Sequence, residues 1–181
     1  MNKKFALLTV VLAIAVTSAV AGMKNPTVGG QEMYPTKNII ENAVNSADHT
    51  TLVAAVKAAG LVETLEGAGP FTVFAPTNEA FAKLPAGTVD TLLKPENKPT
   101  LTKVLTYHVG RLSASDLKKQ IKAGKGTAEL TTVEGGKLWA TAEGNHIMLK
   151  DEKGGTTWVT IPNVFQSNGV IHVVDAVLMP N

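Results

Sequence analysis

The hydrophobic positions of this 181-residue chain change their spacing part-way along the sequence. Up to about residue 121 they recur every three or four residues, which places them on one face of a helix. Capping residues precede several of these runs, and glycine or proline ends them. The predicted helices start at Lys37, run from Asp48 or Thr50 to Gly60 and from Asn78 to Pro85, cover Thr88–Leu93 and Pro99–Thr106, and run from Ser113 or Ser115 to Ile121.

The rest of the chain is rich in β-branched residues and is interrupted by glycine-containing turns. The predicted strands are Phe71–Phe74 and Tyr107–Val109 in the helical half, and Lys137–Ala142, His146–Lys150, Thr156–Ile161 and Val170–Leu178 in the second half. The segments 134–136, 143–145 and 154–155 between them suit tight turns. Helices followed by an antiparallel meander indicate an α+β fold.

The run Gly69–Pro85, with the sequence GPFTVFAPTNEAFAKLP, combines a strand, a turn and a helix. Phe71–Phe74 alternates aromatic and β-branched residues, as a short buried strand does. Pro76 interrupts the strand, because proline has no amide donor and a fixed φ. Asn78 can then cap a helix that Pro85 ends. This run contains no catalytic pattern.

The same run resembles the first conserved box of the fasciclin domain, an extracellular adhesion module. A second run, NGVIHVVDAVLMP at Asn168–Pro180, resembles the closing box of that family, and Tyr107-His108 matches its Tyr-His pair. The three matches lie in the family's order and span about two-thirds of the chain. The resemblance implies a fasciclin-like α+β fold, with N-terminal helices packed on a twisted, largely antiparallel β-wedge.

The first 21 residues are typical of a secretory signal peptide. Lys3 and Lys4 precede the apolar run Phe5–Val16, and a small-x-small cleavage site ends at Ala21. The apolar run is shorter than the ~20 residues that a membrane-spanning helix needs. We therefore expect residues 1–21 to be removed on export, to the periplasm, the cell surface or the medium.

Two further segments complete the predicted organisation. Residues 22–36 are rich in glycine and proline and are expected to form a leader that lies over the domain, anchored by Tyr34 and Pro35. Residues 37–181 are expected to form one fasciclin domain. The sequence shows no internal repeat and no low-complexity linker.

Charge and cysteine content narrow the possible functions. Without residues 1–21 the chain has 15 lysines and arginines and 15 aspartates and glutamates, so it is close to neutral. This balance argues against nonspecific binding to nucleic acids or anionic membranes. The chain has no cysteine, so an exported domain must be stabilised by packing rather than by disulfides.

The sequence contains no recognisable catalytic or metal-binding motif. The four histidines form no His-x-His or HExxH pattern, no thiol can complete a zinc site, and no GxSxG elbow is present. We therefore predict no enzyme activity, no metal and no cofactor. A hydrolytic alternative requires His108 or His172 beside a carboxylate and a serine.

Tyr107 and His108 are the first candidate binding residues. The resemblance implies a contact role, because this pair is associated with adhesion, including integrin binding, in animal fasciclin domains. The neighbouring Tyr107 and Val109 also favour a buried, hydrogen-bonded histidine that ties the chain together. Both roles are compatible with one another.

Pro162, Asn163, Val164 and Phe165 are the second set of candidates. With Ile161 they occupy the place of the Glu-Pro-Asp-Ile-Met type integrin motif of vertebrate relatives, but both carboxylates are missing. The structural alternative is a bulged or edge segment in which Pro162 prevents strand addition and Val164 and Phe165 pack inward.

Two more sets of side chains have both a functional and a structural interpretation. Lys118, Lys119, Lys122 and Lys125 form a basic stripe that could bind a polyanion or simply be solvated. Trp139 and Trp158 could stack on sugar rings, but cross-strand packing between them is the simpler hypothesis.

These observations predict a non-catalytic extracellular or periplasmic module for cell adhesion or interaction. We expect a monomer whose partner is a cell-surface or extracellular matrix protein or glycan, with no nucleic-acid binding and no stable membrane insertion. The alternative is a small apolar-ligand carrier of the cell envelope. This alternative predicts an apolar cavity of roughly several hundred Å3 lined by Phe74, Phe81 and Trp158.

Overall fold

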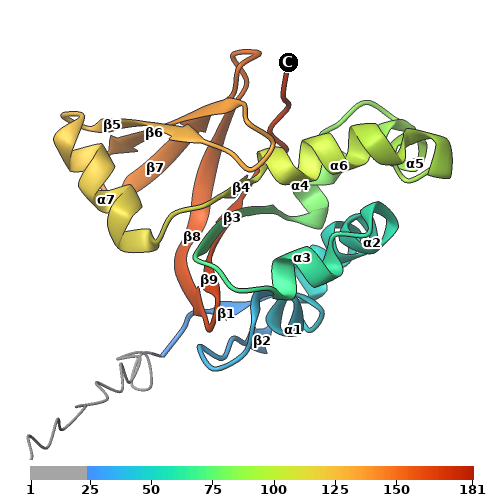
Figure 1. Ribbon diagram of the computed structural model, residues 1–181, viewed down its shortest axis with the longest axis horizontal. Helices are drawn as coiled ribbons and strands as arrows, with labels where there is room; N and C mark the ends of the chain where they lie inside the picture. Colours follow the sequence, from blue (N-terminus) through green and yellow to red (C-terminus); the bar gives the residue numbers. More distant parts are fainter. Residues whose placement is uncertain (1–23) are drawn as a thin grey trace, which may run out of the picture.

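The computed structural model describes residues 24–181, so the predicted signal peptide lies outside the described residues. Its largest element is a seven-stranded sheet of order β4-β3-β9-β8-β7-β6-β5. Helices α1 to α6 gather on one side of β3 and β9, whereas α7 lies against β5 and β6 (Figure 1). The sheet is strongly curled, and a bridge between Gly110 and Thr132 joins residues near its two edges.

The elements have the following bounds. The helices are α1 (Ile39–Ala43), α2 (Thr50–Ala59), α3 (Val62–Glu66), α4 (Asn78–Ala82), α5 (Thr88–Leu92), α6 (Lys98–Tyr107) and α7 (Ala114–Ala123). Single 3-10 turns cover Ala47–His49 and Pro95–Asn97. The strands are β1 (Thr27–Val28), β2 (Gln31–Glu32), β3 (Phe71–Pro76), β4 (Val109–Gly110), β5 (Thr127–Thr131), β6 (Lys137–Glu143), β7 (His146–Lys150), β8 (Thr156–Gln166) and β9 (Gly169–Val174).

The strands β3 and β9 pair in parallel at the centre of the molecule. Their register runs from Phe71 opposite Gly169 to Pro76 opposite Val174. All six residues of β3 and nearly all of β9 are buried, as expected for a strand pair that is covered on both faces. The two runs that resemble the fasciclin boxes, Gly69–Pro85 and Asn168–Pro180, therefore form one structural unit.

This strand pair separates two hydrophobic cores. Val73 and Ile171 belong to the core beneath the helices α1 to α6. Phe74 and Val174 belong to a second core, which α7 and the inner face of β5 to β8 complete with Leu117, Leu138 and Leu149. Alternation along β3 and β9 sends successive side chains into different cores.

The second half of β8 forms a bulged edge. β8 pairs with β7 only through its first residues, Thr156–Trp158, and its register with β9 shifts between Val159 and Val164. The hypothesis of a bulged edge segment around Pro162 is therefore confirmed. Val164 is buried, but Phe165 is only half-buried, so the inward packing predicted for Phe165 is wrong in part.

Several predicted boundaries differ from the structure. Tyr107 ends α6 and His108 caps it, so the strand predicted at Tyr107–Val109 is reduced to Val109–Gly110. Thr77 caps α4 in place of Asn78. The carboxamide of Asn78 instead accepts a hydrogen bond from Thr51 N near the start of α2, at 3.0 Å. The strand β5 was not predicted, and β8 extends past Ile161 to Gln166.

The leader is attached at Tyr34 through its backbone rather than by side-chain stacking: Tyr34 N donates to Asn42 Oδ1 at 3.0 Å, and Tyr34 O accepts from Asn42 Nδ2 at 2.8 Å. Other residues of the leader add to this attachment. The leader forms the hairpin β1–β2, buries Val28 and Met33, and leaves the Tyr34 side chain exposed. The side chain of Asn25 accepts from Phe165 N at 2.8 Å and donates to Phe165 O at 2.6 Å. Asn25 thus occupies the backbone groups that the unpaired edge of β8 presents.

Asn168 connects the start of β9 to the helical half. Its Oδ1 accepts from Ile39 N at 3.1 Å, and its Nδ2 donates to Leu65 O at 2.7 Å and to Gly67 O at 3.0 Å. The neighbouring Gly169 lies so close to β3 that a Cβ there would be 2.2 Å from Phe71 O. The Asn168 carboxamide and the lack of a side chain at Gly169 therefore allow β9 to lie this close to β3.

Substitution of Asn168 by alanine is expected to destabilise the fold by roughly 2–4 kcal/mol. The change leaves one amide and two carbonyl groups without their partner in a partly buried position. Urea unfolding measures the difference, and Ser167→Ala is the control because Ser167 is exposed. Equal free energies of unfolding for the two variants would contradict the role given to Asn168.

Candidate functional site

Tyr107 joins the end of α6 to the meander. Its buried hydroxyl donates to Lys137 O at 2.5 Å and accepts from Glu152 N at 3.1 Å. Burial raises the pKa of Tyr107 to about 12, so the phenol stays neutral. Both hydrogen-bonding capacities of the hydroxyl are used inside the domain.

His108 joins the end of α6 to the closing segment, by which we mean the residues 175–181 that follow β9. Its Nδ1 donates to Val104 O at 2.8 Å, and its Nε2 accepts from Leu178 N at 3.0 Å. Burial lowers the pKa of His108 to about 4, which keeps the ring neutral, as these two hydrogen bonds require. The interpretation of His108 as a hydrogen-bonded core residue is confirmed.

Among the second set of candidates, Pro162 is exposed, and Asn163 and Phe165 are half-buried. Asn163 has a φ of +60°, in the left-handed region that asparagine tolerates better than most residues. Its amide donates to His172 Nδ1 at 3.2 Å. Asn163 therefore shapes the bulge through its backbone.

His172 supports this bulge from the core. Its ring stacks on Phe74 with 5.8 Å between centroids, and its Nδ1 accepts the Asn163 amide. Its Nε2 is buried and has no hydrogen-bond partner within residues 24–181. Burial, with a smaller contribution from Lys118, lowers the pKa of His172 to about 4.

The outer face of the meander carries an exposed aromatic patch. We use this name for the solvent-facing residues of β5 to β8, which include Trp139, Met148, Lys150, Trp158 and Thr160. Trp158 is 39% exposed. It lies opposite Met148, whereas Trp139 lies opposite Lys150, so the two tryptophans are not the cross-strand partners that we expected.

An open groove crosses part of the outer face. It has a volume of about 600 Å3 and is lined by Thr127, Trp139, Thr141, Met148, Lys150 and the turn 151–154. Asp151 holds that turn, because its carboxylate accepts from Lys153 N, Gly155 N and Met179 N at 2.6–3.0 Å. The groove therefore combines one aromatic wall with hydroxyl and ammonium groups on rigid elements.

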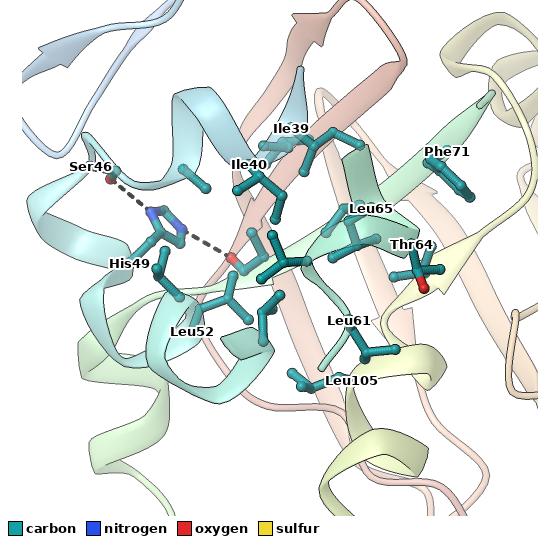
Figure 2. A pocket seen from close by; sticks show the side chains of 18 of the residues that line it. Ile39, Ile40, Ser46, His49, Leu52, Leu61, Thr64, Leu65, Phe71 and Leu105 are labelled. Carbon is teal, nitrogen blue, oxygen red and sulfur yellow. Dashed lines mark hydrogen bonds between the residues drawn. The ribbon is translucent and has the colours of Figure 1, made fainter. Parts of the chain in front are cut away.

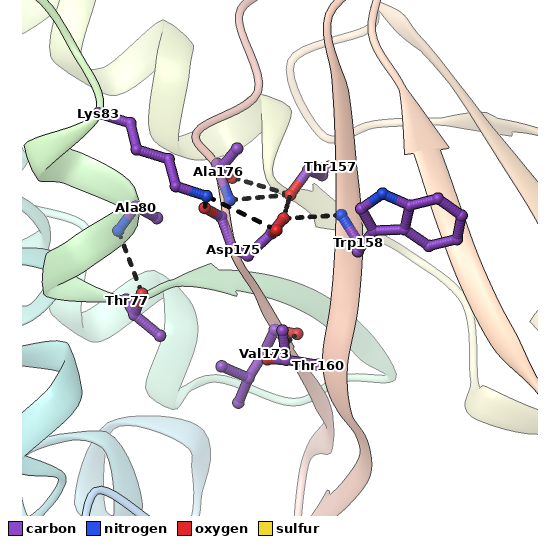
Figure 3. Close-up of polar contacts among 9 residues, drawn as sticks. All are labelled: Thr77, Ala80, Lys83, Thr157, Trp158, Thr160, Val173, Asp175 and Ala176. Atoms are coloured by element: carbon purple, nitrogen blue, oxygen red, sulfur yellow. Dashed lines mark hydrogen bonds and ion pairs between the residues drawn. The ribbon is translucent and has the colours of Figure 1, made fainter.

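A polar network around Asp175 fixes the backbone beneath Trp158 (Figure 3). Asp175 Oδ1 accepts from Trp158 N and from Thr157 Oγ1, both at 2.8 Å. Lys83 Nζ lies 3.6 Å from Asp175 Oδ2 and donates to its carbonyl oxygen. Burial raises the pKa of Asp175, but these hydrogen bonds and the Lys83 charge outweigh it and bring the pKa below its usual value.

The four lysines of the basic stripe are exposed on α7 and just beyond it. Lys119 Nζ lies 3.9 Å from Asp116 Oδ1, and Lys125 has a φ of +55° at the turn into β5. No other side chain of the stripe forms an ion pair within residues 24–181. The stripe is a solvated surface, and its binding of a polyanion stays a prediction.

An apolar cavity of about 60 Å3 lies between the helices and the inner strands (Figure 2). Its walls come from α1, α2, α3, α6, β3 and β9, and include Ile39, Ile40, Leu52, Val56, Leu61, Leu65, Phe71, Leu105 and Ile171. Phe74, Phe81 and Trp158 do not line it. The cavity therefore lies in a different place from the one that the carrier hypothesis predicted, and it is smaller.

The described residues contain no arrangement that resembles a hydrolytic or metal site. The ring nitrogens of His108 and His172 bond only to backbone groups, so neither forms the required trio with a carboxylate and a serine. Within residues 24–181 no three histidine, aspartate or glutamate side chains lie where they could hold a metal ion. In the same part of the chain, no helix is long and apolar enough to cross a membrane.

Comparison with known proteins identifies the class to which this fold belongs. The sequence profile of the fasciclin domain matches residues 47–180. The chain is 43% identical to protein sll1483 of Synechocystis sp., over 94% of this chain and 96% of that protein. It is 38% identical to immunogenic protein MPB70 of Mycobacterium bovis, over 76% of this chain and 66% of that protein. The chain belongs to the fasciclin domain family.

A solved structure confirms the fold. The chain superimposes with a TM-score of 0.67 and 18% identity on a FAS1 domain pair from the insect cell adhesion molecule fasciclin I, over 79% of this chain and 51% of that chain. The α+β fold inferred from the sequence, with helices packed on a largely antiparallel sheet, is therefore confirmed. Parallel pairing of β3 and β9 is the exception to the antiparallel arrangement.

We expect Tyr107→Phe to lower the free energy of unfolding by roughly 1–3 kcal/mol. The variant leaves Lys137 O and Glu152 N without the hydroxyl that bonds to both. The same substitution at the exposed Tyr34 is the matched control and should change stability by less than about 0.5 kcal/mol. Urea unfolding of both variants tests this, and equal values would contradict a bridging role for the Tyr107 hydroxyl.

Stability should also fall as the pH decreases from about 6.5 to about 4. The pKa values of His108 and His172 are about 4 in the folded chain and 6.5 ordinarily, so the unfolded chain binds more protons in this window. The stabilisation is complete above pH 6.5 and is lost as the pH falls through 4, by up to roughly 3 kcal/mol per histidine. Urea unfolding at a series of pH values measures this slope.

Two variants separate the buried histidines from other titrating groups. His172→Asn should reduce the slope of the pH profile by about half, because His108 still contributes. His146→Asn should leave the slope unchanged because His146 is exposed. The slope of the free energy of unfolding against pH is compared between the variants and the wild type, because His172→Asn also changes the overall stability. A wild-type slope in His172→Asn would show that His172 does not account for the effect.

Proposed function

We propose that the protein is an exported, non-catalytic module for adhesion or extracellular interaction. The exposed aromatic patch on the outer face of the meander carries this proposal. A tryptophan that is 39% exposed, opposite a half-buried methionine and on the same face as a half-buried tryptophan, is typical of a contact surface. The solved relative is itself described as part of a cell adhesion molecule.

The contact surface proposed here includes the second set of sequence candidates. Outward positions alternate along β8 from Trp158 through Thr160 to Pro162, since each of these residues is exposed. Asn163 and Phe165 extend this row as half-buried residues at the bulge. Val164 supports the row from the core.

Tyr107 and His108 contribute to this surface from beneath. Their polar atoms are engaged inside the domain, where they fix the turn that borders the groove and the closing segment. A partner would therefore depend on the pair for the shape of the surface rather than for a direct hydrogen bond. This role combines the two interpretations that the sequence left open.

The partner class follows from the chemistry of the outer face. Tryptophan and methionine offer apolar and aromatic contacts, while threonine hydroxyls and the ammonium of Lys150 offer hydrogen bonds. Such a mixture suits a cell-surface or extracellular matrix protein or a glycan. We propose that the chain acts there as a monomer without a cofactor, either in the periplasm or outside the cell.

Adhesion of protein-coated beads to cells tests the proposal. Trp158→Ala should weaken the affinity for the partner by roughly thirtyfold, as expected for a central aromatic contact. Tyr34→Ala is the matched control, because Tyr34 is as exposed as Trp158 but belongs to the leader. Urea unfolding first establishes that both variants are folded.

Two outcomes would count against the proposal. If Trp158→Ala and a Pro162→Ala variant both adhere like the wild type, the contact surface lies elsewhere on the domain. If adhesion survives complete unfolding of the protein, the folded module is not responsible and the function itself is refuted.

A further inference from the structure

We propose that the apolar cavity under α1, α2 and α3 binds the alkyl chain of a single-chain carboxylate, with the carboxylate at Lys57 and Arg111. This site is separate from the outer face of the meander, because it lies on the opposite side of β3 and β9. It goes beyond the proposed interaction function and does not depend on it.

The interior of the cavity is suited to hydrocarbon. Its walls are formed by aliphatic side chains and by Phe71, and no acidic residue lines it. The polar pair at one end is satisfied internally, since Ser46 Oγ lies 2.8 Å from His49 Nδ1 and His49 Nε2 lies 3.4 Å from Ala75 O (Figure 2). Burial lowers the pKa of His49, so its ring adds no charge to the wall.

These features make the interior an unfavourable place for water. A cavity of about 60 Å3 is larger than the ~10–15 Å3 that one water molecule occupies, but water needs two or more polar partners to be held. Ser46 and His49 already bond to each other and to the backbone. An apolar occupant therefore enters without displacing well-bound water.

The size of the cavity limits the shape of the occupant. Pockets for drug-sized molecules measure roughly 300–1,000 Å3, so a molecule of that size does not fit a cavity of about 60 Å3. An unbranched chain of a few methylene groups is slender enough to enter. The short helices α1 and α3, of five residues each, form part of the wall that must admit it.

The rim indicates the charge of the head group. Its exposed side chains are Lys57 on α2, Thr64 on α3 and Arg111 after β4. Neither cation forms an ion pair within residues 24–181. Two unpaired cations and a hydroxyl beside an apolar interior complement an anion that carries a hydrocarbon tail.

Calorimetric titration of the full protein with carboxylates from butanoate to decanoate tests the site. Affinity should rise about fourfold with each methylene group while the chain is being buried, and then level off when the cavity is full. The double variant Lys57→Ala/Arg111→Ala should weaken octanoate binding roughly tenfold and leave octanol binding unchanged. Lys118→Ala/Lys119→Ala, with the same change in charge on α7, should bind octanoate like the wild type.

A filling variant tests the location of the chain. Ala43 lines the cavity and is only half-buried, so Ala43→Leu adds volume there with little strain. It should lose both octanoate and octanol binding. If Ala43→Leu does not fold, methyl NMR of the wild type replaces it, and octanoate should shift the resonances of Val56, Leu61 and Ile171.

Three results would overturn the inference. They are the absence of octanoate binding at millimolar concentration, equal octanoate affinity in the wild type and the Lys57→Ala/Arg111→Ala variant, and methyl shifts confined to residues outside the cavity. None of these results bears on adhesion through Trp158, so the two proposals stand or fall independently.

Discussion

The parallel pairing of β3 and β9 is the constraint on which the rest of the structure depends. Both strands are covered on both faces, so each must supply apolar side chains to two cores at once. The helical half can pack on one side only because the meander closes the other. The pair joins residues almost one hundred positions apart, and everything between them must fold back onto it.

Buried and half-buried polar side chains hold the connections to this pair in a chain without disulfides. Asn168 links β9 to the helical half, His108 links α6 to the closing segment, and Asp175 links β8 to α4. Asn168 and His108 bond to backbone atoms, whereas Asp175 bonds to Trp158 N and to the side chains of Thr157 and Lys83. Such hydrogen bonds contribute modestly when made, but a buried partner left without one costs about 1–3 kcal/mol. The network therefore specifies where each segment attaches.

Local features of the fold could be predicted from the sequence, whereas long-range ones could not. The end of α2 at Gly60 was predicted, and Ser113 was one of the two caps predicted for α7, because both features depend on nearby residues. Tyr107 was placed in a strand because a helix end and a short buried strand are equally apolar. Thr127–Thr131 was missed because its central residues, Ala128, Glu129 and Leu130, favour helices more than strands.

The surfaces were harder to predict than the core. Trp158 and Val159 look alike in hydrophobicity, and only the register with β7 shows which one faces solvent. The cavity rim joins Lys57 to Arg111 across more than fifty residues, which no local pattern indicates. The bulged edge of β8 has one more consequence. With Asn25 bonded to Phe165 and Pro162 lacking an amide proton, this edge is a poor template for fibril growth, so crowded copies of the domain resist polymerisation through it.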